Sequence, residues 1–372
     1  MAQHQRKAYK DWFDRSAALA LAQQMSCVYP AFDEKTFIRR CTRNLNSLEF
    51  NARVRQFADA LAVCLPDDYG KAIGIVKRSL PPKLPDCESV TDGWLQWPVG
   101  QYIANHGQSH FDESMHAMVE LTQRFSAEFA IRPFVEHQAE ATFKFLSLRI
   151  EHPSPHVRRW CSEGTRTRLP WGNKLVSLIE DPSPIWPILE ALKDDDELYV
   201  RRSVANSLND LSKDHPGAVL ALCKRWSKNN SSSTEWVIRH ALRGMIKAGD
   251  AGALALIGFN KPEKITAELR ISPAKIKIGE SIALQLVLKN TSARPQSLLV
   301  DYIVYYQGKQ GSKRAKVFKW KALKLAAGES AEIIKKHPMR FTSIRALYAG
   351  RHRVELQING IVVASENFSL KF

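Results

Sequence analysis

The sequence of 372 residues predicts a mainly α-helical domain, an α-solenoid of HEAT-like repeats, followed by an all-β immunoglobulin-like sandwich. Three observations carry this prediction. Apolar residues in the first 258 positions recur at helical spacing, similar segments recur about every 40 residues, and short alternating strands follow Gly258. We therefore expect a helical domain over residues 1–260 and a β-domain over residues 261–372.

The segment 111–129 shows the helical spacing most clearly, because its apolar residues follow one another at steps of three and four. These residues are Phe111, Met115, Met118, Thr122, Phe125 and Phe129. A proline-rich stretch over residues 79–87 divides an N-terminal group of helices from the rest.

Three later segments resemble one another and predict repeated helix pairs. Each has a turn followed by a helix that begins with an apolar residue, an arginine and a second Arg or His. The first arginines, Arg158, Arg201 and Arg239, are 43 and then 38 residues apart. This is the period of HEAT-like units, which stack into a curved array with a concave face. An arginine at this place often pairs with an acid of the neighbouring repeat, so we expect a structural role for these three.

The C-terminal part predicts about seven short strands. Residues 281–290, 297–306 and 350–359 alternate or run apolar with β-branched and aromatic side chains, and glycine-containing turns separate them. This number of strands in about 105 residues is typical of an immunoglobulin-like sandwich. All six cysteines precede residue 261, so the sandwich lacks an inter-sheet disulfide.

The charge indicates a polyanionic partner. The chain carries +16, and residues 261–372 hold 21 Lys and Arg against 8 Asp and Glu, whereas residues 1–260 hold 33 against 30. The basic excess therefore belongs to the β-domain, which favours nucleic acid as the partner. The widely spaced cysteines, the polar N-terminus and the lack of a long apolar run favour a cytosolic protein over a secreted or membrane protein.

Polar stripes along the second helices of the repeats supply candidate binding residues. Arg159, Glu163 and Arg166 share one helix face, opposite Val157, Trp160, Cys161 and Gly164. The second stripe is Arg202, Asn206 and Asp210, and the third is His240, Arg243 and Lys247. We expect these stripes to form a track of cations with two embedded carboxylates, in which Arg159 and Arg166 contact phosphates. The alternative for Glu163 is a solvated ion pair.

The densest basic loop lies at residues 308–316. Lys313, Arg314 and Lys316 are expected to contact DNA phosphates or the minor groove, and a solubilising turn is the alternative. The acidic run 194–197 has the density of a metal site, but it lies at a repeat turn, where a helix N-terminus favours acids in any case. The histidines at 106, 110 and 116 do not have a recognisable ligand spacing, so we expect no metal site. No nucleotide-binding or serine-hydrolase motif is present. The residues alone thus indicate a nucleic-acid binder and do not indicate an enzyme.

Three stretches, FSAEFAIRPF (125–134), HPSPHVRRWCSEGTRTRLPWG (152–172) and YVRRSVANSLNDLSKDHP (199–216), resemble the AlkC branch of the AlkC/AlkD DNA alkylpurine glycosylases. The resemblance covers nearly the whole chain, because some AlkC proteins also carry a C-terminal immunoglobulin-like domain. It implies a monofunctional glycosylase that hydrolyses the N-glycosidic bond of N-methylated bases, chiefly 3-methyladenine, in duplex DNA, and so acts in base excision repair.

The resemblance also implies roles for particular residues. Glu128, Glu163 and Asp210 match carboxylates beside the damaged nucleotide, Phe129 and Trp171 match aromatic positions near the lesion, and Arg159 and Arg166 match backbone-contacting arginines. Carboxylates suit this reaction, because they stabilise positive charge on the deoxyribose and position a water. Glu163 or Asp210 would orient that water, and Glu128 would add electrostatic stabilisation. No cofactor or metal is required, and the base is expected not to flip into a pocket.

The resemblance implies that the immunoglobulin-like domain completes the encirclement of alkylated double-stranded DNA. An encircling monomer is the simplest oligomeric state, and we expect it in a bacterial-type cytosol, associated with the nucleoid. Two other functions remain open on the residues alone. One is a non-catalytic HEAT-repeat module that binds nucleic acid or senses damage. The other is a HEAT scaffold whose basic sandwich docks an acidic protein.

Overall fold

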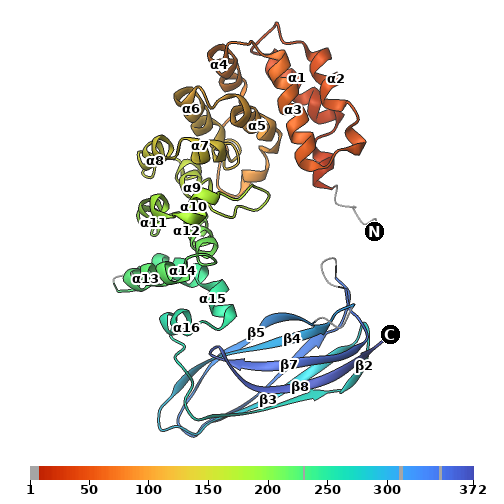
Figure 1. The fold of residues 1–372 in the computed structure, drawn as a ribbon, viewed down its shortest axis with the longest axis vertical. Coiled ribbons are helices and arrows are strands. Elements are labelled where there is room, and N and C mark those ends of the chain that lie inside the picture. Colours follow the sequence, from red (N-terminus) through yellow and green to blue (C-terminus); the bar gives the residue numbers. More distant parts are fainter. Residues whose placement is uncertain (1–7, 229–230, 310–312, 343–345) are drawn as a thin grey trace. The chain divides into compact units, whose positions relative to one another are not determined.

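The computed structural model describes residues 8–228, 231–309, 313–342 and 346–372, and it divides the chain into two compact units (Figure 1). One unit holds the described residues up to His215 together with α14 (Ser232–Ala241). The other holds α13 (Pro216–Trp226) and the described residues from Leu242 onwards. Helices precede strands along the chain, which confirms the predicted order of a helical region and a β-domain.

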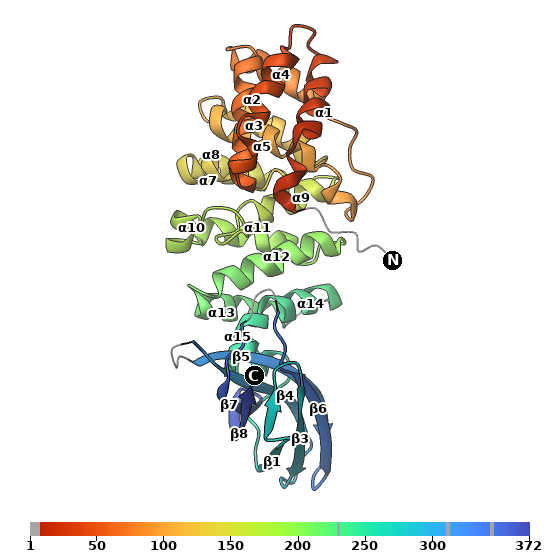
Figure 2. The same ribbon diagram turned by 90° about the vertical axis from the view of Figure 1, so that its right-hand side faces the viewer.

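The first unit is a succession of short helices (Figure 2). Aspartates cap several of them: the carboxylate of Asp14 accepts the N–H groups of Ser16 and Ala17, for example, and Asp33 and Asp68 act in the same way. Proline occupies the first turn of α5, α7, α9 and α11, where its missing N–H costs nothing. The helices are α1 (Arg15–Ser26), α2 (Glu34–Thr42), α3 (Phe50–Cys64), α4 (Tyr69–Ser79), α5 (Trp97–His106), α6 (Phe111–Thr122), α7 (Arg132–His137), α8 (Ala139–Ser147), α9 (Pro155–Glu163), α10 (Val176–Glu180), α11 (Trp186–Leu192) and α12 (Leu198–Leu211).

The helix predicted over residues 111–129 is shorter than expected, because α6 ends at Thr122. The N–H groups of Arg124 and Phe125 both bond the carbonyl of Leu121, each at 2.8 Å, so the chain leaves the helix axis there. Met115 and Met118 are fully buried, as the spacing predicted. Phe125 and Phe129 lie instead in the segment that leads to α7, which carries the candidate site.

The three similar segments form three helices that lie side by side. The helices are α9, α12 and α14, and α12 packs against both of the others (Figure 2). Val157, Trp160 and Cys161 of α9 are fully buried, so the predicted packed face of this helix is confirmed. The assignment of these units to the HEAT class stays a prediction.

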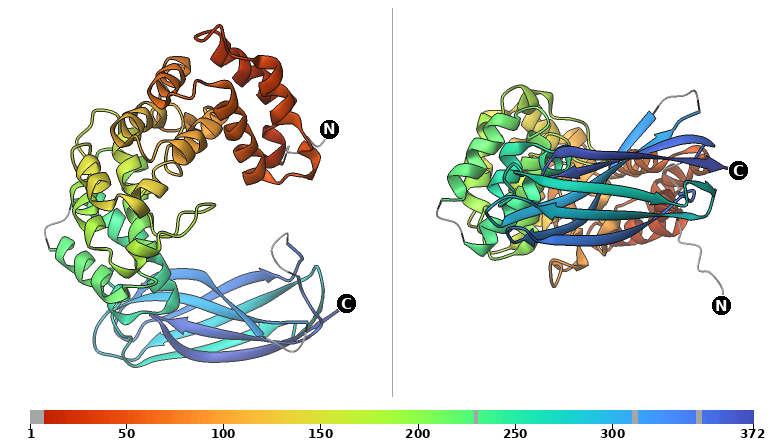
Figure 3. Two further views of the ribbon diagram at one scale, coloured as in Figure 1. Left: turned by 45° about the horizontal axis from the view of Figure 1, so that its top comes forward. Right: turned by 90° about the horizontal axis from the view of Figure 1, so that it is seen from below.

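The second unit contains two sheets around one apolar core (Figure 3). The three-stranded sheet has the order β1-β3-β6 and the five-stranded sheet β2-β8-β7-β4-β5, with every pairing antiparallel except β2 with β8. Alternate residues of β3 and β4 point into the core, among them Leu284, Leu286, Val300 and Val304. The strands are β1 (Ile265–Ser272), β2 (Lys275–Lys277), β3 (Ser281–Asn290), β4 (Gln296–Gln307), β5 (Lys313–Leu325), β6 (Ser330–Pro338), β7 (Gly350–Ile358) and β8 (Ile361–Lys371).

The last helices, α13, α15 (Arg243–Ala248) and α16 (Ala251–Leu256), belong to the compact unit of the sandwich. The turn after α15 touches the β7–β8 turn so closely that a Cβ on Gly249 would lie 2.5 Å from Nε2 of Gln357 and 3.0 Å from Cα of Gly360. The last helix ends at Leu256 and the first strand begins at Ile265, whereas the second compact unit already includes the chain from Leu242. A functional boundary at residue 260 remains a prediction. None of the helices in the described segments has the length and apolar character needed to cross a membrane.

Candidate functional site

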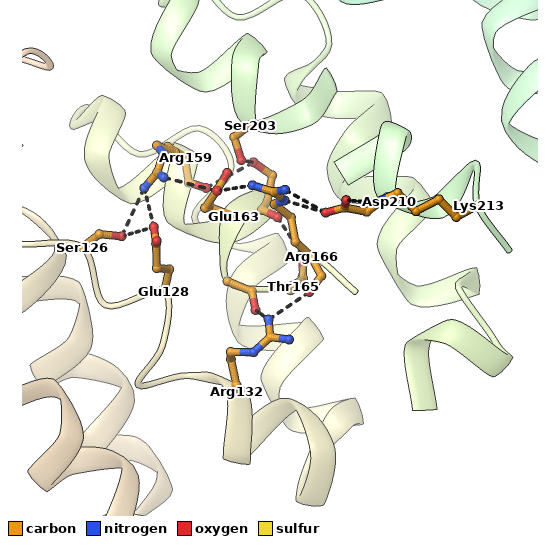
Figure 4. Close-up of polar contacts among 12 residues, drawn as sticks. Ser126, Glu128, Arg132, Arg159, Glu163, Thr165, Arg166, Ser203, Asp210 and Lys213 are labelled. Carbon is orange, nitrogen blue, oxygen red and sulfur yellow. Dashed lines mark hydrogen bonds and ion pairs between the residues drawn. The ribbon is translucent and has the colours of Figure 1, made fainter. Parts of the chain in front are cut away.

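Three carboxylates and two arginines form an alternating chain of charges in the first unit (Figure 4). Nη1 of Arg159 lies 2.8 Å from Oε2 of Glu128, and its Nη2 lies 3.4 Å from Oε1 of Glu163. Nη1 of Arg166 lies 2.6 Å from the same Glu163 oxygen, and its Nη2 lies 2.8 Å from Oδ2 of Asp210. We call these five residues the carboxylate chain. Each arginine thus serves two acids.

The members of the carboxylate chain come from three parts of the fold. Glu128 stands in the segment between α6 and α7, Glu163 ends α9, and Asp210 is near the end of α12. Arg159 and Glu163 are one helical turn apart, and Arg166 follows in the turn after α9. The packing of α9 against α12 brings Asp210 to Arg166.

Polar neighbours hold both ends and the middle of the carboxylate chain. The hydroxyl of Ser126 donates to Oε2 of Glu128 at 2.8 Å, and Lys213 lies 3.0 Å from Oδ1 of Asp210. Ser203 of α12 hydrogen-bonds Glu163 and lies 2.6 Å from the hydroxyl of Ser162. These contacts leave the carboxylates little freedom to reorient.

Burial makes the charges in the carboxylate chain depend on one another. The side chains of Glu163 and Asp210 are each 6% exposed, and that of Glu128 is 14% exposed. Burial alone would raise the pKa of Glu163, but Arg159 and Arg166 outweigh it and hold that pKa below its usual value. Burial likewise opposes the charge of both arginines, but the flanking carboxylates raise their pKa values. Glu163, Arg159 and Arg166 are therefore each held in their charged form.

A further arginine, Arg132 of α7, fixes the backbone beside the carboxylate chain. Its Nη1 donates to the carbonyls of Gly164 and Arg166, at 3.2 and 2.9 Å, and its Nε donates to that of Asn173 at 3.1 Å. Burial lowers the pKa of Arg132 to about 10. Arg132 therefore ties the segment 164–173, which carries both Arg166 and Trp171, to α7.

Aromatic side chains line the neighbourhood of Glu128. The ring of Phe129 stacks on Trp97 of α5, with centroids 4.9 Å apart, and Trp171 stacks on the same indole at 6.0 Å. Trp171 is 58% exposed and has a φ of +66°, a left-handed backbone conformation that residues other than glycine rarely adopt. Strain of this kind often marks functional positions. We call Trp97, Phe129 and Trp171 the aromatic wall.

The sequence predicts most of these residues as candidates, but the structure differs from that prediction in the exposure of two arginines. Arg159 and Arg166 were expected on an exposed stripe, but their side chains are 15% and 8% exposed, because acids from neighbouring elements cover them. Arg202 of the second stripe is exposed. Trp97, Ser126, Arg132 and Ser203 were missed, because no pattern in one sequence links them to the site.

Arg158 pairs with an acid beside a neighbouring repeat, as expected for a structural arginine at this place. It forms a two-pronged ion pair with Asp195, which precedes the neighbouring helix α12. Arg201 donates to the carbonyl of Asp196 at 2.9 Å, and Arg239 pairs within its own helix, with Glu235 at 3.6 Å.

The predicted basic loop lies on the second unit and is only partly described. Arg314 and Lys316 of β5 are exposed, and Nζ of Lys316 lies 5.5 Å from the ring centre of Phe318. Residues 310–312 and the side chain of Lys313 lie outside the described part of the structure. Among the described residues, no group of three His, Cys, Asp or Glu side chains is arranged to hold a metal ion.

Comparison with known proteins gives three similarities. Residues 265–372 match the family model of the C-terminal Ig-like domain of the uncharacterised protein YhaZ. The chain is 32% identical to the uncharacterized protein YhaZ of Bacillus subtilis (strain 168) over 363 residues, 97% of this chain and 99% of that protein. It also matches the solved structure of the Pseudomonas fluorescens alkylpurine DNA glycosylase AlkC bound to DNA containing an abasic site analog, with a TM-score of 0.90 and 36% identity, over 98% of this chain and 100% of that chain.

Proposed function

The chain belongs to the AlkC family of alkylpurine DNA glycosylases, in the branch with a C-terminal Ig-like domain, and we propose that it excises N-methylated bases, chiefly 3-methyladenine, from alkylated duplex DNA. The observation that carries this proposal is the carboxylate chain beside the aromatic wall. In this role the protein works as a monomer in the bacterial cytosol, where it contributes to base excision repair.

The reaction makes particular demands on the site. A purine methylated at N3 carries a positive charge, so it is already a good leaving group. Positive charge then grows on the deoxyribose as the bond to the base breaks, and fixed carboxylates stabilise such charge best where water is scarce. Arg159 and Arg166 hold the pKa of Glu163 below its usual value in spite of its burial, which favours the negatively charged form.

The contacts suggest a division of labour among the three acids. Arg166 and Lys213 occupy both oxygens of Asp210, and Arg159 and Arg166 share Oε1 of Glu163. Ser126 and Arg159 both bind Oε2 of Glu128, so among the contacts of the described residues its Oε1 is open to a water, and Glu128 is the most exposed of the three. Glu128 is therefore our candidate for orienting the attacking water. This differs from the division that the resemblance alone implies, in which Glu163 or Asp210 takes this role.

The aromatic wall and the basic sandwich would bind the DNA. Trp171 and Phe129 offer flat surfaces to the bases around the lesion, and Arg202, Lys313, Arg314 and Lys316 would contact the sugar-phosphate backbone. In this proposal the lesion reacts without entering a protein pocket. Fluorescence of 2-aminopurine placed beside the lesion tests this point, because a signal of full extrusion into the protein contradicts it.

Base release from methylated duplex DNA, followed by chromatography, tests the activity. Wild-type protein should release 3-methyladenine, whereas Glu128→Gln, Glu163→Gln and Asp210→Asn should reduce the rate by orders of magnitude while DNA binding survives. Asp214→Asn is a matched control, because Asp214 is ion-paired with Arg168 at 2.7 Å outside the carboxylate chain. DNA binding without release of any methylated base would favour a non-catalytic damage sensor.

A further inference from the structure

A pocket of about 470 Å³ lies beside the aromatic wall. Trp97, Phe129 and Trp171 line one part of it, and Asn51, Gln101 and Asn173 line other parts. Its size and its mixture of flat apolar surface with a few polar groups are typical of sites for small aromatic molecules. The function proposed above uses the faces of Phe129 and Trp171 but assigns no role to the rest of this volume.

The pocket borders the carboxylate chain through a smaller cavity. That cavity, of about 10 Å³, is large enough for one water and shares Trp97, Gln101 and Phe129 with the pocket. It also reaches Ser126, whose hydroxyl donates to Glu128 at 2.8 Å. The pocket is therefore next to the place where the proposed reaction occurs.

The charges around the pocket are opposite to those of the carboxylate chain. Arg55, Arg132 and Lys174 contribute three cations to the lining, and Glu136 contributes one carboxylate. Arg55 and Lys174 are exposed, and the side chain of Arg132 is buried beside the pocket. This excess of positive charge favours a neutral aromatic ligand over a positively charged one of the same shape.

Cleavage changes the charge of the purine in the matching direction. When the bond between C1′ and N9 breaks, both bonding electrons go to the base and cancel its positive charge. Water adds to C1′ and loses its proton to a carboxylate. The base is thus a cation before the reaction and a neutral molecule after it.

We propose that this pocket is a product site, which binds the neutral methylated purine after its release and disfavours the cationic lesion before it. The inference rests on the proposed glycosylase function. Stacking on the aromatic wall binds the purine plane. In this proposal Gln101 reads the hydrogen-bonding edge of the purine. Nε2 of Gln101 donates one N–H to Oδ1 of Asn105 at 2.8 Å, and its second N–H and its Oε1 would pair with an acceptor and a donor of that edge.

Saturation-transfer NMR on the full chain, in mildly alkaline buffer, tests the inference with two probes. The first is free 3-methyladenine, which is neutral, and the second is 3,9-dimethyladeninium, in which a methyl group replaces the sugar and the positive charge persists. We expect 3-methyladenine to bind, and we expect the affinity for the cation to be lower by roughly tenfold or more. Equal or tighter binding of the cation would overturn the proposal, because the pocket would then accept the lesion itself. Tighter binding of dAMP than of adenine would also contradict it, by making the pocket a nucleotide site.

Matched variants locate the binding. Gln101→Leu should weaken 3-methyladenine binding roughly tenfold, because one directed hydrogen-bonding group is lost. Gln23→Leu, an exposed glutamine of α1 outside the pocket, should leave binding unchanged. Lys174→Glu should reduce the difference in affinity between the neutral and the cationic probe, because it replaces a positive charge at the pocket with a negative one. Equal effects of Gln101→Leu and Gln23→Leu would place the purine elsewhere and refute the assignment.

The binding test separates this inference from the proposed function. Glu163→Gln should bind 3-methyladenine as wild type does although it releases no base. A wild-type protein that releases 3-methyladenine from DNA but does not bind it free refutes the product site alone. A protein that binds it free but releases none from methylated DNA refutes the glycosylase function, and with it the role of the pocket as a product site.

Discussion

Arg158 and Asp195 form a two-pronged ion pair, with Nε to Oδ2 at 2.6 Å and Nη2 to Oδ1 at 3.0 Å, that ties α9 to the turn before α12. The next residue, Arg159, points instead to Glu128 and Glu163. Two consecutive arginines therefore serve different purposes, one in joining helices and one in setting the charge of the candidate site.

This difference predicts opposite outcomes for two neighbouring substitutions. Arg158→Ala should lower the melting temperature, because it leaves Asp195, whose side chain is 5% exposed, without its partner, at a cost of about 3 kcal/mol. Its rate of base release at a temperature where it is folded should stay near that of wild type.

Arg159→Ala should instead reduce base release by roughly 10²-fold or more, because Glu128 and Glu163 lose their shared counter-charge and their fixed positions. Arg159→Lys keeps the positive charge, but a single ammonium group cannot contact both Glu128 and Glu163 as the two guanidinium nitrogens do. This variant should therefore recover part of the rate of base release. Single-turnover rates and thermal melts on the same preparations separate the two effects. Equal rates for Arg158→Ala and Arg159→Ala would contradict the assignment.

A buried carboxylate predicts a pH dependence of the sandwich. Burial raises the pKa of Asp301 on β4 to about 6, against a usual value of 3.8, and its Oδ1 has no hydrogen-bond partner within the described structure. The folded state therefore binds the proton more tightly than the unfolded state. The stability that Asp301 contributes is fully present below pH 3.8 and is lost as pH rises through about 6.

Asp301→Asn should accordingly stabilise the sandwich at neutral pH, by on the order of 2 kcal/mol, and flatten its stability between these pH values. Thermal melts at a series of pH values measure this. Glu332→Gln, an exposed carboxylate of β6, is the control and should change little. A destabilised Asp301→Asn at neutral pH would show that the charged form is the favoured one.

The contact between two turns predicts which glycines tolerate a side chain. Gly249 has a φ of +83° and faces Gly360 and Gln357, so Gly249→Ala pays both for a left-handed backbone and for a steric clash. Gly258 has a φ of +88° with nothing within 4 Å, so Gly258→Ala carries the backbone cost alone. Gly249→Ala should therefore lower the melting temperature clearly more than Gly258→Ala, and equal shifts would show that the turns separate readily.

The exposed cations of β5 predict the salt dependence of DNA binding. Arg314→Glu together with Lys316→Glu should weaken binding to duplex DNA and reduce the slope of log K against log salt by about 1.8, since each phosphate contact contributes about 0.9. Lys289→Glu with Lys336→Glu changes the net charge equally on the three-stranded sheet and should affect the slope less. Identical slopes for the two double variants would mean that only net charge matters.

Local patterns predicted the parts of the fold that local forces decide. The strands expected at 281–290, 297–306 and 350–359 match β3, β4 and β7 closely, because alternation reports directly on which face is buried. The packed face of α9 was predictable for the same reason. The end of α6 was not, because a bond from Ala127 to the hydroxyl of Thr122 and tight turns at Leu121 override the apolar spacing.

The candidate site was predictable only where helical spacing or the family resemblance applied. Arg159 and Glu163 follow from their separation by one turn, and the repeat places Asp210 on the same expected track. No periodicity joins Glu128 to them, because it meets Arg159 through tertiary packing. Trp97 lies 32 residues before Phe129 and 74 before Trp171, so only the folded chain shows their stack. The burial of Arg166 was missed because its covering acid, Asp210, lies 44 residues away.

The carboxylate chain also constrains how this protein can evolve. Since each arginine serves two acids, the loss of any one member removes part of the compensating charge from a neighbour that stays charged and buried. A change at one of these positions is therefore harmful unless a second change accompanies it, which is strong epistasis. The five positions should be inherited together, and a lineage that abandons the chemistry should lose them as a group rather than one by one.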